Sequence, residues 1–244
     1  MKLIALMFCL VAGSTLAQAP DYAREQRIAD EVAFAVVTGD PVRLEGEDGR
    51  SFLGLFTRAP GAKAGVVLVH GSGVNPDWGL IGELRAKLAD AGYSTLSIQM
   101  PVLAAEAMPE DYVALLPVAA LRIMAAVQSM QIKGYKKIAL VSHSMGSRMS
   151  NEFLLAKHPG IDAWVAIGMP VELRGADRFE FPVFDLYGTK DLTPVLETVV
   201  ARERAIHALR GSRQNAVAEA DHYFDDHYAE LDAQVKSFLD QVLR

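Results

Sequence analysis

The chain has 244 residues, of which 51% are apolar and 22% are charged, and its formal net charge is −6. This length fits one domain or at most two, and the apolar fraction is sufficient for one hydrophobic core. An acidic chain without a basic stripe repels phosphates, so the composition argues against a nucleic-acid-binding protein.

The N-terminus has the three parts of a secretory signal peptide. A positively charged start precedes an apolar run over residues 3–13, and the small-residue pattern Ala-Gln-Ala follows at 17–19. The run is shorter than the roughly 20 apolar residues that span a bilayer. We therefore predict a signal peptide over residues 1–19, with cleavage after Ala17 as the alternative. An uncleaved anchor and a buried N-terminal helix are the other interpretations of this segment.

A signal peptide implies an exported protein, periplasmic or extracellular. Residues 20–244 are then expected to form a single domain without a membrane-spanning segment. Cys9 is the only cysteine, and it lies inside the predicted signal peptide. The exported chain would have no thiol, which excludes disulfides, cysteine metal ligands and a cysteine nucleophile. We expect neither a metal nor another cofactor, since no ligand spacing typical of a metal site is present.

Helical and strand patterns follow one another from residue 21 onward. Residues 21–37 are charged with an apolar stripe at helical spacing, although 32–37 is apolar throughout and is also compatible with a short strand. Short strands at 42–44 and 51–57 flank a Glu-Asp-Gly turn, which predicts a hairpin.

The rest of the chain alternates between the two kinds of pattern. Strands are predicted at residues 64–69, 93–100, 137–141, 163–167, 183–187 and 215–219. Helices are predicted at residues 79–91, 111–131, 145–157, 193–209 and 228–243. This alternation implies βαβ units. We therefore expect an α/β protein, a three-layer sandwich with a mostly parallel sheet and antiparallel strands at its N-terminal edge.

One motif at a strand-to-helix junction has the pattern of a nucleophile turn. It reads Ser142-His143-Ser144-Met145-Gly146. A serine hydroxyl must be exposed and close to a base before it can attack, and a tight turn between strand and helix lifts it above the sheet. Small residues two before and two after the serine relieve the crowding that this turn creates. The alternative is an ordinary turn in which Ser144 only caps the helix.

Four blocks of the chain together resemble the α/β-hydrolase superfamily. They are His70-Gly71-Ser72-Gly73, the motif around Ser144, Gly188-Thr189-Lys190-Asp191 and Asp221-His222-Tyr223-Phe224, and each follows a predicted strand. The order serine, aspartate, histidine is that of the superfamily. The blocks span residues 66–224, and the chain looks like a small, lidless, secreted bacterial member.

The resemblance implies a role for each residue of a catalytic triad. Ser144 would attack a carbonyl carbon, His222 would take its proton and return it to the leaving group, and Asp191 would orient the imidazole. Asp185 is the rival acid, although it lies inside the predicted strand rather than beyond its carboxyl end.

The resemblance also implies an oxyanion hole and a substrate-binding rim. The backbone N–H groups of Met145 and Ser72 would bind the oxyanion, with Gly73 as the alternative second donor. Loops at 100–108 and 169–179 are expected to form the rim. The candidate substrate-binding residues are Gly71, Gly73, Met100 and Met169.

The chain departs from the family pattern in two respects. Ser142 stands where the superfamily most often has glycine, two residues before the nucleophile. The connection between the predicted strands at 163–167 and 183–187 is also too short for the lid that many relatives insert there. We therefore expect a site that is open or covered only by short loops.

Five other histidines compete with His222 for the role of base. His70 and His143 lie inside the motifs and are expected to support the site from behind, whereas the remaining three lie near or within helices. Those three are His158, His207 and His227.

The leading hypothesis is hydrolysis of an ester or thioester, or secondarily an amide, through a Ser144 acyl-enzyme. The partner would be a small-molecule acyl substrate. The rival hypothesis is a noncatalytic binding protein on the same fold, since a fold alone does not fix a function. A third is a cell-envelope accessory factor whose partner engages residues 21–37.

Overall fold

The computed structural model describes residues 19–46, 49–62, 64–156 and 159–243 of the chain. The predicted signal peptide lies outside the described residues except for its last one, and so do two turn residues of the predicted hairpin, at 47–48, and the end of the predicted helix at 157.

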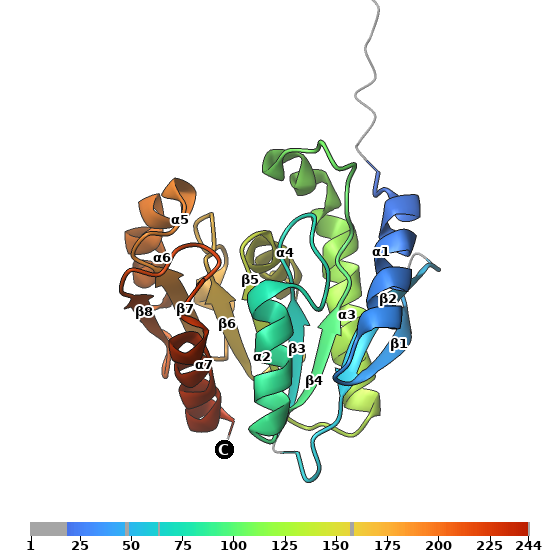
Figure 1. Cartoon of the computed structure of the whole chain (residues 1–244). Coiled ribbons are helices and arrows are strands. Elements are labelled where there is room, and N and C mark those ends of the chain that lie inside the picture. The colour runs from blue at the N-terminus through green and yellow to red at the C-terminus, as the bar shows by residue number, and fades with distance from the viewer. Residues whose placement is uncertain (1–18, 47–48, 63, 157–158, 244) are drawn as a thin grey trace, which may run out of the picture.

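An eight-stranded sheet forms the centre of the structure, with the strand order β1-β2-β4-β3-β5-β6-β7-β8 (Figure 1). β1 and β2 pair antiparallel, β2 pairs antiparallel with β4, and all other neighbours are parallel. The strands are β1 (Asp40–Glu45), β2 (Ser51–Thr57), β3 (Gly65–Val69), β4 (Ser94–Ile98), β5 (Ile138–His143), β6 (Ala163–Ile167), β7 (Val183–Gly188) and β8 (Arg213–Val217). The predicted fold class is confirmed, including the antiparallel hairpin at the N-terminal edge.

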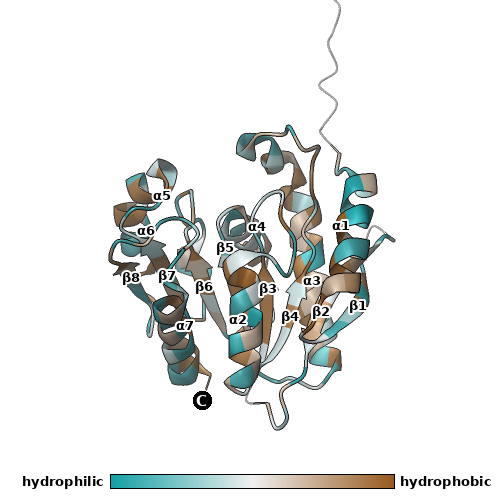
Figure 2. Cartoon of the chain, in the orientation of Figure 1, coloured by the Kyte–Doolittle hydropathy of each residue, from teal (hydrophilic) through white to brown (hydrophobic). Residues whose placement is uncertain are grey.

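Helices cover both faces of this sheet, because its central strands are apolar on both sides. In β3, Val66 and Leu68 pack with one set of helices, and Val67 and Val69 pack with the other. This division follows from the two-residue period of a strand. Figure 2 shows the resulting concentration of apolar residues in β3.

The helices divide between the two faces according to these clusters. α2 and α7 lie on the face turned toward the viewer in Figure 1, with α1 beside them over β2, whereas α3 and α4 lie behind the sheet. The helices are α1 (Tyr22–Ala35), α2 (Gly79–Asp90), α3 (Leu116–Ile132), α4 (Met145–Leu154), α5 (Thr193–Glu197), α6 (Val199–Ile206) and α7 (Tyr228–Val242), with short 3-10 helices η1 (Pro109–Leu115) and η2 (Ala176–Arg178).

Several predicted boundaries differ from those in the structure. The helix predicted at 111–131 begins as η1, and α3 starts only at Leu116. Pro117 explains the break, because proline fits the first turn of an α-helix and disrupts the interior. The helix predicted at 193–209 divides at Thr198, whose hydroxyl donates to the carbonyls of Pro194 and Val195 and so competes with the helical pattern.

The two ends of the chain give further differences. α1 ends at Ala35 and Val36 is extended, so residues 32–37 do not form the alternative strand. β8 occupies Arg213–Val217, two residues before the predicted strand. It is a polar strand at the edge of the sheet, where no alternation of apolar residues marks its limits.

α1 is tied to the loops at the carboxyl edge of the parallel strands. The backbone N–H of Asp21 donates to the carbonyl of Val102 over 2.8 Å. The Arg24 guanidinium donates to the carbonyl of Leu103 over 2.5 Å and to that of Gly73 over 3.4 Å. The N-terminal helix thereby fixes two of the loops that surround the candidate site.

Among the described residues, the stretch Pro109–Ile132 is long and apolar enough to cross a membrane by length and composition alone. In this structure it covers one face of the sheet. Ala119, Ile123 and Ala126 have no exposed area and belong to the core behind the sheet. Its apolar character is therefore that of a core helix.

Candidate active site

The strand order of the sheet reverses between β3 and β5. These two strands are neighbours, but the chain leaves β3 toward β4 on one side and leaves β5 toward β6 on the other. In open α/β sheets, the carboxyl ends of the strands at such a reversal point are where ligands bind. Residues 70–73 follow β3 and Ser144 follows β5, so both reach this point.

Ser144 occupies a strained turn between β5 and α4. Its backbone has φ 56° and ψ −126°, a combination that non-glycine residues rarely adopt. Gly146 allows the turn to form, since a Cβ there would lie 2.4 Å from the carbonyl oxygen of His70. The small residue at this position therefore lets α4 begin directly against the end of β3.

The serine at position 142 is accommodated in a buried polar network. Ser142 has no exposed area, and its hydroxyl lies within hydrogen-bond distance of Ser147 Oγ and the Val165 carbonyl. It also accepts a hydrogen bond from the Trp164 indole over 2.9 Å. The departure from glycine therefore leaves no unsatisfied polar group below the turn.

The three residues of the predicted triad lie in hydrogen-bond contact. The distance from Ser144 Oγ to His222 Nε2 is 2.8 Å, and that from His222 Nδ1 to Asp191 Oδ1 is 2.6 Å. The carboxylate can only accept, so Nδ1 carries the proton and Nε2 accepts from the hydroxyl. Asp191 and His222 are 6% and 4% exposed, whereas Ser144 is half-buried. The three side chains thus form one hydrogen-bonded line in the order Ser144, His222, Asp191.

Asp191 and Asp185, the two candidates for the acid, have different hydrogen-bond partners. Asp191 also accepts from the N–H groups of Leu192, over 2.7 Å, and Gly188, over 3.4 Å, which holds its carboxylate toward His222. Asp185 has no exposed area and pairs with the Arg202 guanidinium over 2.9 Å. The rival acid is therefore engaged in a buried ion pair and does not contact the imidazole in this structure.

Gly168 is the residue that lets the imidazole sit so close to the sheet. Its φ is +54°, and a Cβ at this position would lie 3.1 Å from His222 Cε1 and 3.4 Å from Asp191 Oδ2. Only glycine combines this backbone conformation with so close an approach.

His70 and His143 support the site as neutral hydrogen-bonding groups. The backbone N–H of Met100 donates to His70 Nε2 over 2.9 Å, so His70 Nδ1 carries the proton and donates to the Gly71 carbonyl over 2.7 Å. His143 Nε2 donates to the backbone carbonyl of His222 over 2.9 Å. Each ring therefore fixes the backbone of a loop that faces Ser144.

The hydrogen bond from His70 to the Gly71 carbonyl also sets the direction of the Ser72 N–H, the predicted oxyanion donor. The peptide between Gly71 and Ser72 is planar and trans, so the Ser72 N–H points away from the carbonyl that His70 holds. The loop passes beside Ser144, because a Cβ on Gly71 would lie 3.3 Å from Ser144 Cβ. Gly73, the alternative donor, has φ +73° and follows in the same loop. The Met145 N–H lies at the N-terminus of α4, where it has no partner within the helix.

The two methionines predicted for the rim lie elsewhere. Met100 and Met169 have no exposed area and pack in the core behind the sheet. The prediction that their side chains line the open surface is therefore wrong. Each lies two residues after the end of a strand. Its backbone therefore lies at the carboxyl edge of the sheet, while its side chain packs in the core.

Sequence reasoning missed two aromatic residues beside the triad. Tyr223 and Trp78 are 44% and 42% exposed, and their rings meet edge to face with centroids 5.6 Å apart. Tyr223 directly follows the candidate base, and Trp78 precedes the first residue of α2. The place of Tyr223 directly after His222 was a signal that could have identified it, whereas nothing local in the sequence marks Trp78.

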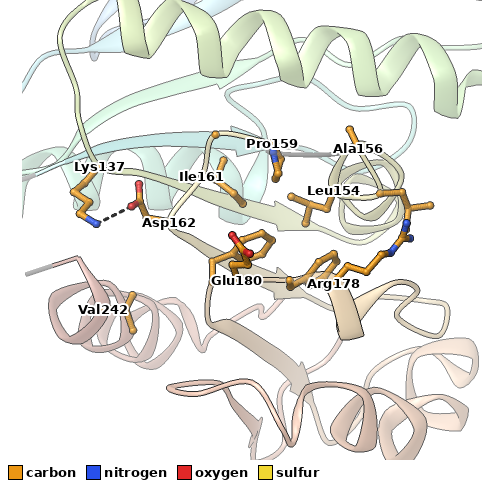
Figure 3. Close-up of a pocket in the computed structure, with 13 residues that line it drawn as sticks. Lys137, Leu154, Ala156, Pro159, Ile161, Asp162, Arg178, Glu180 and Val242 are labelled. Atoms are coloured by element: carbon orange, nitrogen blue, oxygen red, sulfur yellow. Dashed lines mark hydrogen bonds and ion pairs between the residues drawn. The ribbon is translucent and has the colours of Figure 1, made fainter.

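A separate cavity lies at the opposite edge of the sheet, shown in Figure 3. It has a volume of about 730 Å³ and is lined by residues around the amino ends of β5 and β6, among them Lys137, Asp162 and Phe181. Among the lining residues that the structure describes there is no serine, histidine or cysteine.

No group of three or more His, Cys, Asp or Glu side chains is arranged to hold a metal ion in the part of the chain that the structure describes. The acidic loop beside His222 is held by hydrogen bonds from its own backbone N–H groups to one of its carboxylates. Asp221 Oδ1 accepts from the N–H groups of Tyr223 and Asp225 over 2.9 and 3.3 Å. This carboxylate is used to shape the loop.

The two buried histidines lead to a prediction about stability. Burial lowers the pKa of His70 to about 4 and, together with the neighbouring His222, that of His143 to about 3. The unfolded chain binds protons on these rings below pH 6.5, where the folded chain does not, so stability falls as the pH decreases from 6.5 toward 4. We expect His70 alone to account for a loss of roughly 2 kcal/mol between pH 7 and pH 5. Urea unfolding at both pH values measures it.

Two variants check the origin of this loss. His70→Asn should show a shallower dependence on pH than the wild type. Asp232 acts in the opposite direction, because burial raises its pKa to about 6 and the folded chain therefore gains a proton first. Asp232→Asn should make the loss steeper, and an unchanged slope in both variants would contradict the assignment.

Comparisons with known proteins agree with this architecture. Residues 66–243 match the family described as "Alpha/beta hydrolase family", and residues 2–120 match one described as "Protein of unknown function (DUF3530)". No curated protein matches the chain.

Solved structures with the same fold include several hydrolases. A dienelactone hydrolase from Anabaena variabilis has a TM-score of 0.67 at 18% identity, covering 84% of this chain and 97% of its own. The esterase Pf2001 from Pyrococcus furiosus has a TM-score of 0.69 at 15% identity, covering 84% and 93%. An alpha-beta serine hydrolase homologue from Coxiella burnetii has a TM-score of 0.66 at 17% identity, covering 84% and 99%.

At these identities the solved structures establish the fold, and the family match covers most of the chain. The resemblance inferred from the four sequence blocks is confirmed at this level, and the fold supports a hydrolase. The chain belongs to the alpha/beta hydrolase family.

Proposed function

We propose that the protein is a serine hydrolase that cleaves an ester or thioester through an acyl-enzyme on Ser144. The observation that carries this proposal is the unbroken chain of hydrogen bonds from Ser144 through His222 to Asp191 at the carboxyl edge of the sheet. The strained backbone of Ser144 is a second support, because such strain clusters at functional sites.

In the proposed mechanism, Ser144 Oγ attacks the carbonyl carbon while its proton passes to His222 Nε2. The N–H groups of Met145 and Ser72 then bind the oxyanion, and preorganised donors of this kind contribute about 3 kcal/mol each at the transition state. His222 gives its proton to the leaving oxygen or sulfur, which departs and leaves the acyl group on Ser144. Water, deprotonated by His222, completes the hydrolysis. Asp191 stabilises the imidazolium in both halves.

Labelling with a fluorophosphonate probe tests the proposal directly. The probe reacts with an activated serine, so we expect one labelled peptide, containing Ser144, in the folded protein. The heat-denatured protein and the Ser144→Ala variant are the controls, and neither should react. Labelling that is absent from the folded wild type, or that persists in the variant, would contradict the proposal.

The second candidate is a noncatalytic binding protein on this fold. It would be favoured if the folded protein neither reacts with the probe nor hydrolyses any ester, thioester or amide. The proposed mechanism is the better candidate, because binding alone gives no reason for a serine, a histidine and an aspartate to share one hydrogen-bonded line.

We also propose that the protein is exported to the periplasm or the medium and loses residues 1–19. The support is the sequence pattern of residues 1–19. Intact-mass measurement of the protein from each cell fraction tests it, with cleavage after Ala19 or Ala17 as the expected products. A soluble cytoplasmic protein that retains Met1 would contradict it.

A further inference from the structure

Two half-exposed aromatic rings stand next to the candidate base. Tyr223 lies against His222 with ring centroids 5.3 Å apart and an interplanar angle of 75°. Trp78 meets Tyr223 with centroids 5.6 Å apart and an angle of 80°. The two residues come from different loops, before α2 and before α7, and these helices lie on the same face of the sheet (Figure 1). We call Trp78 and Tyr223 the aromatic pair.

The loop that carries Trp78 is held in place by its neighbours. The Arg85 guanidinium is buried and pairs with Asp77 over 2.5 Å, directly before Trp78 in the chain. Gly82 packs against the same backbone, since a Cβ there would lie 2.2 Å from the Asp77 carbonyl oxygen. The Trp78 N–H donates to the Asn75 carbonyl over 3.2 Å. The indole is therefore exposed on a fixed backbone.

The loop that carries Tyr223 is equally constrained. Asp221 accepts from the Tyr223 N–H, and Phe224, the next residue, has no exposed area. His143 binds the backbone carbonyl of His222 from below, and its ring lies 6.4 Å from that of Tyr223. An aromatic surface that is rigid before a ligand arrives loses little conformational freedom on binding.

The chemistry of the proposed function places the aromatic pair on the side of the leaving group. In the first half of the reaction, Ser144 Oγ forms a bond to the carbonyl carbon and the bond from that carbon to the leaving oxygen breaks. The proton on His222 Nε2 moves to the departing oxygen, which must therefore lie within hydrogen-bond reach of that nitrogen. The group attached to this oxygen then lies beside His222. Two rings lie against His222, the buried ring of His143 at 4.7 Å and that of Tyr223 at 5.3 Å between centroids, and of these Tyr223 is the exposed one that a substrate can reach.

We propose that the aromatic pair is a leaving-group subsite that selects esters of neutral, planar aromatic alcohols. Aromatic rings in edge-to-face or offset contact stabilise each other beyond the effect of the area that they bury. The adjoining loop carries Asp221, Asp225 and Asp226, so an anionic alcohol would be disfavoured. This inference rests on the proposed function, which it deepens by naming the class of alcohol.

Hydrolysis of acetate esters that differ only in the alcohol tests the subsite. For phenyl, 2-naphthyl and 2,2,2-trifluoroethyl acetate, kcat/KM is divided by the rate of hydroxide-catalysed hydrolysis of the same ester, which removes the difference in chemical reactivity. We expect the wild type to prefer the aryl esters on this scale. Trp78→Leu and Tyr223→Leu should each reduce the preference by about tenfold or less, the range that one aromatic contact contributes.

Conservative and remote variants separate the role of the rings from a general disturbance. Tyr223→Phe and Trp78→Phe keep a ring and should retain the preference. Phe34→Leu removes an aromatic ring that is 94% exposed at the far end of α1, and it should change nothing. An aryl preference that is absent in the wild type, or unchanged in both leucine variants, would overturn the subsite.

Binding of the free alcohol keeps the subsite testable if no ester is hydrolysed. Calorimetric titration of the Ser144→Ala variant with 2-naphthol and with decahydro-2-naphthol should give measurable binding of the aromatic alcohol alone. Adding Trp78→Leu to this variant should weaken that binding by up to about tenfold. Binding without hydrolysis in the wild type would refute the proposed function and retain the aromatic site, whereas hydrolysis without a difference between the two alcohols would refute the site.

Discussion

Ser144→Ala is expected to reduce hydrolysis of short p-nitrophenyl esters by roughly 10⁴- to 10⁶-fold, the scale on which removal of a triad nucleophile acts. The hydroxyl oxygen is the atom that would bond to the substrate, so no neighbouring group can replace it. Residual hydrolysis would come from the oxyanion donors and from substrate binding, which the substitution leaves in place. The measurement is kcat/KM for both proteins over a series of acyl chain lengths.

The fold should survive this substitution. Ser144 makes its side-chain contact with His222 at the surface of the site, and the backbone bond from its N–H to the Ile167 carbonyl does not involve the side chain. Far-UV circular dichroism and the melting temperature should therefore match the wild type. Equal activity in a well-folded variant would show that another group performs the attack, and the proposed mechanism would have to be abandoned.

The parts of the fold that could be predicted are those in which one physical rule dominates. β3 and β5 are buried on both faces, and their apolar runs end where the motifs at residues 70–73 and 142–146 begin. The parallel order of the strands then brings all four separated sequence blocks to one edge of the sheet. This is why the elements around Ser144, Asp191 and His222 could be predicted from sequence.

The parts that could not be predicted depend on contacts between distant segments. Met100 and Met169 follow strands that reach the site, but packing turns both side chains into the core. Trp78 and Tyr223 are 145 positions apart in the sequence, and no local pattern relates them, whereas α2 and α7 on the same face bring them together. The tie between Arg24 and the Gly73 carbonyl is of the same kind.

Asp191→Asn should lower turnover by a factor of order 10⁴, because an asparagine amide in place of the carboxylate favours the wrong tautomer of the catalytic histidine. In this structure the acceptor of the His222 Nδ1–H is one carboxylate oxygen at 2.6 Å. The asparagine side chain can present an N–H there instead, which would leave Nε2 protonated and unable to accept from Ser144. The measurement is kcat for the variant across pH, beside its melting temperature.

Asp185→Asn is the matched control, since it makes the same change of atoms 6 positions away in the same region of the chain. Asp185 pairs with Arg202 where neither side chain has exposed area. Removing one partner of such a pair costs about 3–5 kcal/mol, which corresponds to a melting temperature lower by roughly 10 °C.

Below that temperature the folded fraction of Asp185→Asn should keep its turnover, because Asp185 does not contact His222. The two substitutions should therefore have different effects. Asp191→Asn should lower kcat, whereas Asp185→Asn should lower stability. A stable, inactive Asp185→Asn beside an active Asp191→Asn would reverse the assignment of the acid.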